Sequence, residues 1–174
     1  MRSTLLLIMA ALLAGCSGPA SEQNARPPLE GARIGGAFTL TNQDGQPVSD
    51  TNFAGKFRII YFGYSFCPDI CPVDLQKLMR GLSLFEKENP ELGAKVQPIF
   101  ITIDPQRDTP EAIKPFVERY HPRLIGLTGT PQQIADVAKS FAVIYNKVPG
   151  SAPDRYLMGH SQLAFLMDGE GKPI

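Results

Sequence analysis

The sequence has little excess charge and little hydrophobic length, and both absences exclude classes of protein. Its 174 residues hold 17 Lys and Arg against 17 Asp and Glu, so the formal net charge at pH 7 is zero. No basic stripe runs along the chain, and we therefore expect no nucleic-acid partner. After residue 13 no second long hydrophobic run follows, so we expect the remainder to form a soluble domain.

Histidine and cysteine are also scarce, which limits the metal or redox sites that the chain can build. The only histidines are His121 and His160, and the only cysteines are Cys16, Cys67 and Cys71. These side chains supply most soft metal ligands and all thiol chemistry in proteins. Any thiol chemistry must therefore come from the three cysteines, and a soft metal site is expected to draw on these five residues.

The first cysteine is accounted for by the N-terminal segment. The apolar run from Leu5 to Leu13 is shorter than the roughly 20 residues that a transmembrane helix needs, and it has the character of an export signal. It ends in Leu13-Ala14-Gly15-Cys16, which resembles a bacterial lipobox. That resemblance implies cleavage before Cys16 and lipidation of this residue, whereas the alternative is an ordinary secretory signal followed by an unrelated cysteine.

We accordingly expect three parts in the chain. Residues 1–15 are predicted to be a lipoprotein signal peptide, residues 16–33 a lipidated N-terminus with a flexible polar and proline-containing tether, and residues 34–174 a single folded domain. This predicts a protein outside the cytoplasm, lipid-anchored to a bacterial membrane on its periplasmic side. Thiols tend to oxidise in that compartment.

Hydrophobic periodicity predicts alternating strands and helices in the domain. We expect a β-hairpin over 37–48 and further strands over 57–62, 96–103, 124–127, 143–148 and 162–167. Helices are expected over 72–88, 110–120 and 131–141. This order predicts an α/β fold with a mixed sheet flanked by helices.

Cys67 and Cys71 lie between the strand over 57–62 and the helix that follows it. Open α/β sheets place their sites at this end of the strands. Pro72 suits the first position of a helix, which predicts Cys71 close to the N-cap and Cys67 in the loop ahead. The positive end of the helix dipole then favours a thiolate.

Three roles for the pair remain open from the residues alone. A structural disulfide would close a very small loop, worth only about 2 kcal/mol. Thiol–disulfide exchange commonly uses C-x-x-C, whereas three residues separate these cysteines. A metal site needs a third ligand: His121 lies at a helix exit and is expected to be solvated, while His160 directly precedes a strand. Two thiolates and one imidazole suit Cu(I), and zinc usually takes a fourth ligand.

Longer motifs carry a family resemblance that covers the chain from about Gly35 to its end. These are YFGYSFCPDICP at 61–72, ITIDPQRDTPEAI at 101–113, and GHS at 159–161. Together they resemble the Sco/SenC family of membrane-anchored, thioredoxin-like copper proteins that serve in maturing the CuA centre of cytochrome c oxidase. The resemblance implies a thioredoxin-like fold and copper, as Cu(I) or Cu(II), held by Cys67, Cys71 and His160. It also implies oxidase subunit II, or another copper-accepting protein, as the partner.

Two other functions compete with a copper chaperone. A thiol–disulfide reductase would use Cys67 and Cys71 to keep the target's cysteines reduced and would need no copper, while a redox or copper sensor would report to another protein. A metal site requires His160, whereas simple thiol exchange does not.

Acidic residues near these motifs are further candidates. Asp69 lies between the cysteines, and Asp104 ends a predicted strand, so we expect each to support the metal ligands or to face a partner. Asp108 or Thr109 is expected to cap the next helix, with Arg107 paired locally. Met158 is expected to belong to the core.

The sequence stops at Gly171-Lys172-Pro173-Ile174, where the family continues with another strand and a closing helix. We therefore expect a C-terminally truncated domain, with an unpaired sheet edge and uncovered apolar surface.

Overall fold

The computed structural model describes residues 27–152 and 155–174. The predicted signal peptide, Cys16 and most of the predicted tether lie outside these described residues. Within the described part of the chain, none of the helices has the length and hydrophobicity needed to cross a bilayer.

A six-stranded mixed sheet forms the centre of the molecule, in the order β2-β1-β5-β4-β3-β8. The three middle strands run parallel to one another, and the outer strands pair antiparallel. The bounds are β1 (Thr39–Asn42), β2 (Pro47–Ser49), β3 (Phe57–Gly63), β4 (Val96–Thr102), β5 (Ile125–Thr128) and β8 (Ala164–Met167). Every residue of β4 is buried, as expected for a parallel strand covered on both faces. The predicted α/β class with a mixed sheet is confirmed.

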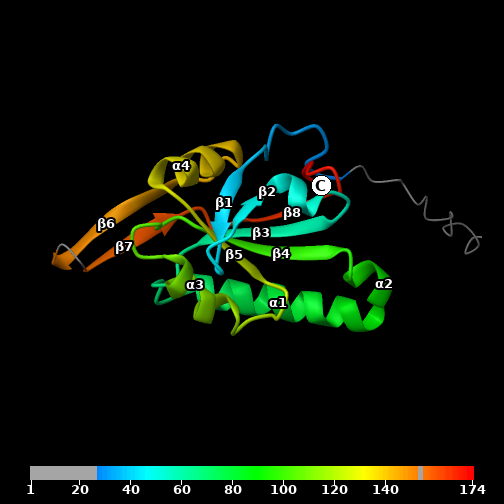
Figure 1. Cartoon of the computed structure of the whole chain (residues 1–174), viewed down its shortest axis with the longest axis horizontal. Helices are drawn as coiled ribbons and strands as arrows, with labels where there is room; N and C mark the ends of the chain where they lie inside the picture. Colours follow the sequence, from blue (N-terminus) through cyan, green and yellow to red (C-terminus); the bar gives the residue numbers. More distant parts are fainter. Residues whose placement is uncertain (1–26, 153–154) are drawn as a thin grey trace, which may run out of the picture.

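Helices cover both faces of this sheet. They are α1 (Ile70–Glu88), α2 (Pro90–Gly93), α3 (Pro110–Val117) and α4 (Pro131–Ser140), with a short 3₁₀ helix, η1 (Asp50–Phe53). Figure 1 shows α1 and α3 on one face and α4 on the other. The N-caps agree with the sequence, because the Thr109 hydroxyl accepts from the Ala112 N–H, and Thr130 forms a capping box with Gln133.

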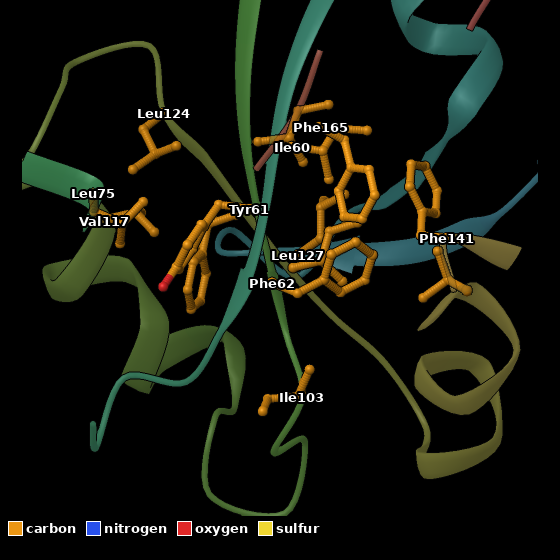
Figure 2. Packing of buried hydrophobic residues seen from close by; sticks show 14 of the residues in the cluster. Ile60, Tyr61, Phe62, Leu75, Ile103, Val117, Leu124, Leu127, Phe141 and Phe165 are labelled. Atoms are coloured by element: carbon orange, nitrogen blue, oxygen red, sulfur yellow. The ribbon is translucent and has the colours of Figure 1, made fainter. Parts of the chain in front are cut away.

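Alternate residues of β3 fill the two halves of the core. Phe62 packs with Phe141 and Phe165, with ring centroids 5.4 and 6.1 Å away, on the α4 face. Tyr61 points to the opposite face, where Leu75 of α1 and Val117 of α3 are also buried (Figure 2). This packing on both faces holds β3 rigidly, and β3 ends at the loop that carries the cysteines.

The hairpin that carries His160 was not predicted from the sequence. β6 (Tyr145–Ala152) and β7 (Arg155–His160) form a separate two-stranded antiparallel sheet that projects from the body of the molecule (Figure 1). The sequence prediction placed only a strand over 143–148 here and left His160 in a loop. Pro149, Gly150 and a register irregularity between Val148 and Ala152 interrupt the alternation that identifies a strand.

The start of α1 also differs from the prediction. The helix begins at Ile70 with Asp69 as its N-cap residue, so Cys71 and Pro72 both lie inside the first turn. Proline is tolerated at this depth because the first N–H groups of a helix have no intrahelical acceptor.

An apolar groove lies between α1 and the β3–β8 side of the sheet, with a volume of about 610 Å³. Its lining includes Phe57, Ile59, Leu82, Phe85 and Leu166. The expected uncovered apolar surface is therefore present. The expected bare edge at β8 needs correction, because Pro173 bridges to Met167 and the Ile174 N–H donates to the Leu166 carbonyl at 3.0 Å.

Candidate metal centre

The loop between β3 and α1 presents two different thiols. The Cys67 N–H donates to the Tyr64 carbonyl at 3.2 Å, which closes a turn, and the Cys71 N–H points to Cys67 Sγ at 3.5 Å. Cys71 is fully buried and Cys67 is half-buried. Both are free thiols in this structure.

Gly63, the last residue of β3, makes the space that the Cys71 thiol occupies. A Cβ at this position would lie 3.1 Å from Cys71 Sγ and 3.0 Å from the Tyr61 ring. Contacts this short force a neighbour to move, because packed interiors leave few voids. The glycine in the YFGYSFC motif is therefore explained by the position of the second thiol.

The two thiols differ in acidity. Burial raises the pKa of Cys71 to about 12, so this thiol is protonated at neutral pH. Burial also acts to raise the pKa of Cys67, but the N–H groups of Cys71, Asp69 and Ile70 outweigh it and lower that pKa below its ordinary value. These donors belong to the start of α1, where unpaired N–H groups favour negative charge.

His160 reaches the cysteines from β7. Its Nε2 lies 3.3 Å from Cys71 Sγ, and its Nδ1 lies 2.9 Å from the Ser161 carbonyl oxygen. A carbonyl only accepts, so Nδ1 carries the proton and Nε2 directs a lone pair at the thiol. Ser161 is itself held, since its N–H donates to the Ile144 carbonyl at 2.9 Å.

Two buried tyrosines limit the tilt of the imidazole. The rings of Tyr61 and Tyr64 each lie 6.3 Å from the His160 ring, at interplanar angles of 87° and 88°. Tyr61 is fixed in turn by donating to the Asp74 carboxylate at 3.1 Å. Edge-to-face contacts and burial therefore hold the histidine in one orientation.

These three side chains have the donor chemistry of a soft metal site. The Cys71 thiol lies next to His160 Nε2, and the Cys71 N–H points to Cys67 Sγ. Two sulfurs with one neutral imidazole suit Cu(I). In residues 27–152 and 155–174, however, no three Cys, His, Asp or Glu side chains already converge as a complete metal site. The structure pairs Cys71 with His160 and leaves Cys67 as the outward member of the group.

Other predicted candidates lie elsewhere. Asp69 is exposed and its side chain makes no capping bond. Asp104 is 3% exposed and accepts from Arg107 and Tyr156, so it does not face a partner, and this alternative for Asp104 is wrong. Arg107 pairs locally, as expected. Met158 packs against the core, also as expected.

His121 was predicted to be solvated, and that prediction is wrong. The residue is 5% exposed, and its Nε2 lies 3.3 Å from the Glu86 carboxylate. Its Nδ1 accepts from the Arg123 N–H at 3.2 Å. Glu86 belongs to α1, which is distant from His121 in sequence. This long-range contact buries a histidine that its place after a helix suggested would be exposed.

Sequence reasoning missed the role of Asp108. It does not cap α3; its buried carboxylate accepts from the Ser65 N–H at 3.0 Å, the Ser65 hydroxyl at 2.5 Å and the Thr102 hydroxyl at 2.6 Å. Burial raises the pKa of this carboxyl, although the three donors oppose the shift. Asp108 therefore ties the cysteine loop to the end of β4.

Comparison with known proteins identifies the family of this chain. A family profile described as SCO1/SenC matches residues 26–174. The Arabidopsis thaliana protein SCO1 homolog 1, mitochondrial, is 44% identical over 144 residues, which cover 83% of this chain and 42% of that protein. The chain thus spans less than half the length of this curated relative.

Solved structures share the fold. Arabidopsis thaliana ScoI, solved with copper bound, is 42% identical, with a TM-score of 0.75 over 81% of this chain and 85% of that one. BsSco, in which a disulfide switch was identified, is 27% identical with a TM-score of 0.62, over 81% of this chain and 80% of that one. It is described as a member of the Sco family of cytochrome c oxidase assembly proteins. With a matching profile over nearly its whole described length and this shared architecture, the chain belongs to the SCO1/SenC family.

Proposed function

We propose that this chain binds copper through Cys67, Cys71 and His160 and hands it to a copper-accepting protein during cytochrome c oxidase assembly. The observation that carries the proposal is the 3.3 Å contact between Cys71 Sγ and His160 Nε2. Simple disulfide exchange does not require a histidine aimed at a buried thiol, whereas the imidazole completes a low-coordinate soft site. The relatives solved with copper, and the relative described as an oxidase assembly protein, support the same reading.

Each of the three residues has a distinct part in the proposed chemistry. Cys67, with its lowered pKa and half-exposed position, supplies a thiolate at the surface. Cys71 gives up its proton when the metal binds, because the thiolate is the ligand form. His160 offers Nε2 in the correct tautomer without losing a proton. Copper supplies the charge that holds these three donors together.

The exposed position of Cys67 suits transfer of copper to a partner by ligand exchange. An incoming thiol of an acceptor such as oxidase subunit II would approach at Cys67, since Cys71 is buried. After release, Cys67 and Cys71 can form a disulfide by reducing a disulfide of the partner; two thiols here become one disulfide as one partner disulfide becomes two thiols. Membrane attachment through a lipid on Cys16, on the periplasmic side, is part of the proposal and rests on the sequence alone.

Copper titration of the reduced protein tests the proposal. Cu(I) and Cu(II) affinities are measured for the wild type and for Cys67→Ser, Cys71→Ser and His160→Ala. His121→Ala is the matched control, because it removes the other histidine while leaving the site intact. Loss of more than tenfold in affinity for His160→Ala, about 1.4 kcal/mol, is expected. Equal affinities for His160→Ala and the wild type would overturn the proposed ligand set.

A thiol–disulfide reductase is the second candidate, favoured by the lowered pKa of the outward Cys67 and by the disulfide switch of BsSco. The two functions separate at His160. Under the reductase hypothesis, His160→Ala still reduces a peptide disulfide derived from an acceptor, and the reaction needs no copper. The sensor hypothesis stays a prediction.

A further inference from the structure

The imidazole and the thiols of the candidate site belong to two separately built parts of the molecule. Cys67 and Cys71 follow β3 of the main sheet, whereas His160 ends β7 of the projecting β6–β7 hairpin. A two-stranded hairpin by itself is only marginally stable in water. The position of His160 relative to the thiols therefore depends on contacts between this hairpin and the body of the domain.

Arg107 makes such a contact from the loop between β4 and α3. Its Nη1 donates to the Tyr156 carbonyl of β7 at 3.0 Å, and its guanidinium carbon lies 3.7 Å from the centroid of the Tyr156 ring. The same carbon also lies 4.9 Å from the centroid of the Phe66 ring and 5.7 Å from that of the Tyr64 ring. One side chain thus contacts both the hairpin and the cysteine loop.

Asp104 fixes the orientation of this guanidinium. Its carboxylate accepts from Arg107 Nε at 2.5 Å and from the Tyr156 hydroxyl at 2.9 Å. Tyr156 is therefore held at both ends, by its carbonyl and by its hydroxyl, and it is 7% exposed. Since His160 lies four residues further along the same strand, fixing Tyr156 fixes the approach of the imidazole.

The contacts require the shape of arginine as well as its charge. A planar guanidinium can donate in two directions in its plane while its faces stack on aromatic rings. Lysine has a compact ammonium that cannot do both. Arg107 is only partly exposed, with 19% of its side-chain surface accessible, so water screens these contacts less than at an open surface.

We propose that Arg107 is a positioning residue for the copper site, which holds the His160 hairpin against the cysteine loop. The inference rests on the proposed function only in treating His160 as a ligand; the bracing of the hairpin stands on the contacts alone. The hydrogen bonds and ion pair of Arg107 go to Asp104 and Tyr156 and to none of the three candidate ligands, so it would act on the metal only through the placement of His160.

The test combines a measurement on the metal-free protein with one on copper. In the reduced, copper-free full chain, amide hydrogen exchange is compared for the wild type, Arg107→Met and Arg107→Lys. Arg119→Met is the matched control: Arg119 follows α3, lies 5.8 Å from the Phe116 ring centroid and donates to the Pro115 carbonyl, away from the hairpin. Copper affinity is then measured for Arg107→Met in the presence and absence of His160→Ala.

We expect Arg107→Met and Arg107→Lys to speed exchange at Arg155–His160 while the strands of the main sheet and the Arg119→Met protein stay unchanged. In the wild-type background, Arg107→Met is expected to weaken copper binding about 10-fold or more. In the His160→Ala background it should change affinity less than about twofold, because the residue acts through the histidine.

Several outcomes would overturn the inference. Unchanged hairpin exchange in Arg107→Met means that the hairpin is not braced by this residue. Wild-type hydrogen exchange of the hairpin in Arg107→Lys means that Arg107 contributes its charge and not the specific shape of its guanidinium. An equal loss of affinity with and without His160 means a general destabilisation. If His160→Ala alone leaves copper affinity intact, the proposed ligand set fails, and the exchange result still decides the bracing of the hairpin.

Discussion

At the residue scale, the two cysteines of one short motif have opposite properties. Cys71 is enclosed by the β3–α1 packing and keeps its proton, whereas Cys67 faces outward beside the first N–H groups of α1. The C-x-x-x-C spacing permits this difference, because the helix already begins at Ile70 and places Cys71 inside its first turn. Cys67 is thus the thiol that is ready to react, and in the proposed copper site Cys71 would become available when the metal displaces its proton.

We predict that iodoacetamide modifies Cys67 well before Cys71 in the reduced, copper-free protein. Because the pKa of Cys67 is lowered, its reaction rate should reach its plateau at a lower pH than for an ordinary thiol, whereas Cys71, with a pKa of about 12, should stay unreactive near neutral pH. Peptide mass spectrometry over a pH series measures both rates. Equal rates at the two cysteines would contradict the assigned roles.

Gly63→Ala is predicted to disturb the site by crowding. The new Cβ would lie 3.1 Å from Cys71 Sγ and 3.1 Å from the Phe100 ring, both in a packed core. We expect a loss of about 1–3 kcal/mol in the free energy of unfolding, together with weaker copper binding.

Gly81→Ala is the matched control for Gly63→Ala. Gly81 lies within α1 and a Cβ there meets nothing within 4 Å, so this variant should be neutral or stabilised by up to about 1 kcal/mol. Urea unfolding measures both variants. The packing account fails if Gly63→Ala is as stable as Gly81→Ala.

Residues with local signatures were predictable, and residues whose partners are distant in sequence were not. The CPDICP and GHS motifs indicated Cys67, Cys71 and His160 as candidate ligands, and the structure brings Cys71 and His160 into contact. The role of Asp108 was missed because its hydrogen-bond donors, Ser65 and Thr102, cannot be identified from the residues next to it. From the sequence alone, an aspartate just before a helix is equally well interpreted as an N-cap. The burial of His121 depends likewise on Glu86, which no local pattern indicates.

At the element scale, the segment after β4 joins the parts of the site. Within three consecutive positions, Arg107 contacts the hairpin, Asp108 accepts from the cysteine loop and Thr109 caps α3. Because the segment leaves a fully buried strand, it is a rigid support for both contacts. This explains why a motif remote from the cysteines in sequence accompanies them.

Asp108→Asn is predicted to destabilise the cysteine loop. The carboxylate oxygens accept from three donors, and an amide would turn its NH₂ toward at least one of them. Leaving a buried donor unsatisfied costs about 1–3 kcal/mol. Unfolding free energies of Asp108→Asn and of the exposed control Asp136→Asn measure the effect, and the control should stay within about 0.5 kcal/mol of wild type. A similar small change in both variants would contradict this role.

The elements themselves were largely predicted where periodicity is regular. β3, β4, α1 and α4 were expected from their apolar spacing and caps and lie within a few residues of the predicted bounds. β7 was missed because a strand of the small hairpin is half-exposed, and its partner β6 contains Pro149 and Gly150. The missed strand is the one that carries His160, so the sequence indicated the candidate ligand but not the element that positions it.

At the scale of the whole molecule, the site and the apolar groove lie at opposite ends of α1. The cysteines are at the helix N-terminus, while Phe85 and Leu82 of the groove are near its C-terminus. The groove is almost entirely apolar, and several of its side chains, including Phe57, Phe85 and Leu166, are exposed. Surfaces of this kind promote self-association in water.

Leu166→Lys is predicted to reduce binding of the dye ANS and to reduce aggregation of the protein. Leu166 lines the groove from β8 and is 46% exposed, so a lysine there reaches solvent while adding charge to the apolar surface. Leu157→Lys on β7 is the matched control, since Leu157 is 49% exposed and lies outside the groove. ANS fluorescence and light scattering measure the effect. Equal decreases for the two variants would show that the groove is not the dye-binding surface.

The central claim is that two sulfurs and one imidazole nitrogen hold copper. X-ray absorption spectroscopy of the reduced, Cu(I)-loaded protein tests it most directly, because it identifies the atoms bound to the metal. The account predicts two sulfur ligands and one histidine nitrogen in the wild type, with the nitrogen lost in His160→Ala and one sulfur lost in Cys67→Ser or Cys71→Ser. A copper environment that is the same in the wild type and His160→Ala, or that contains no sulfur, would contradict it.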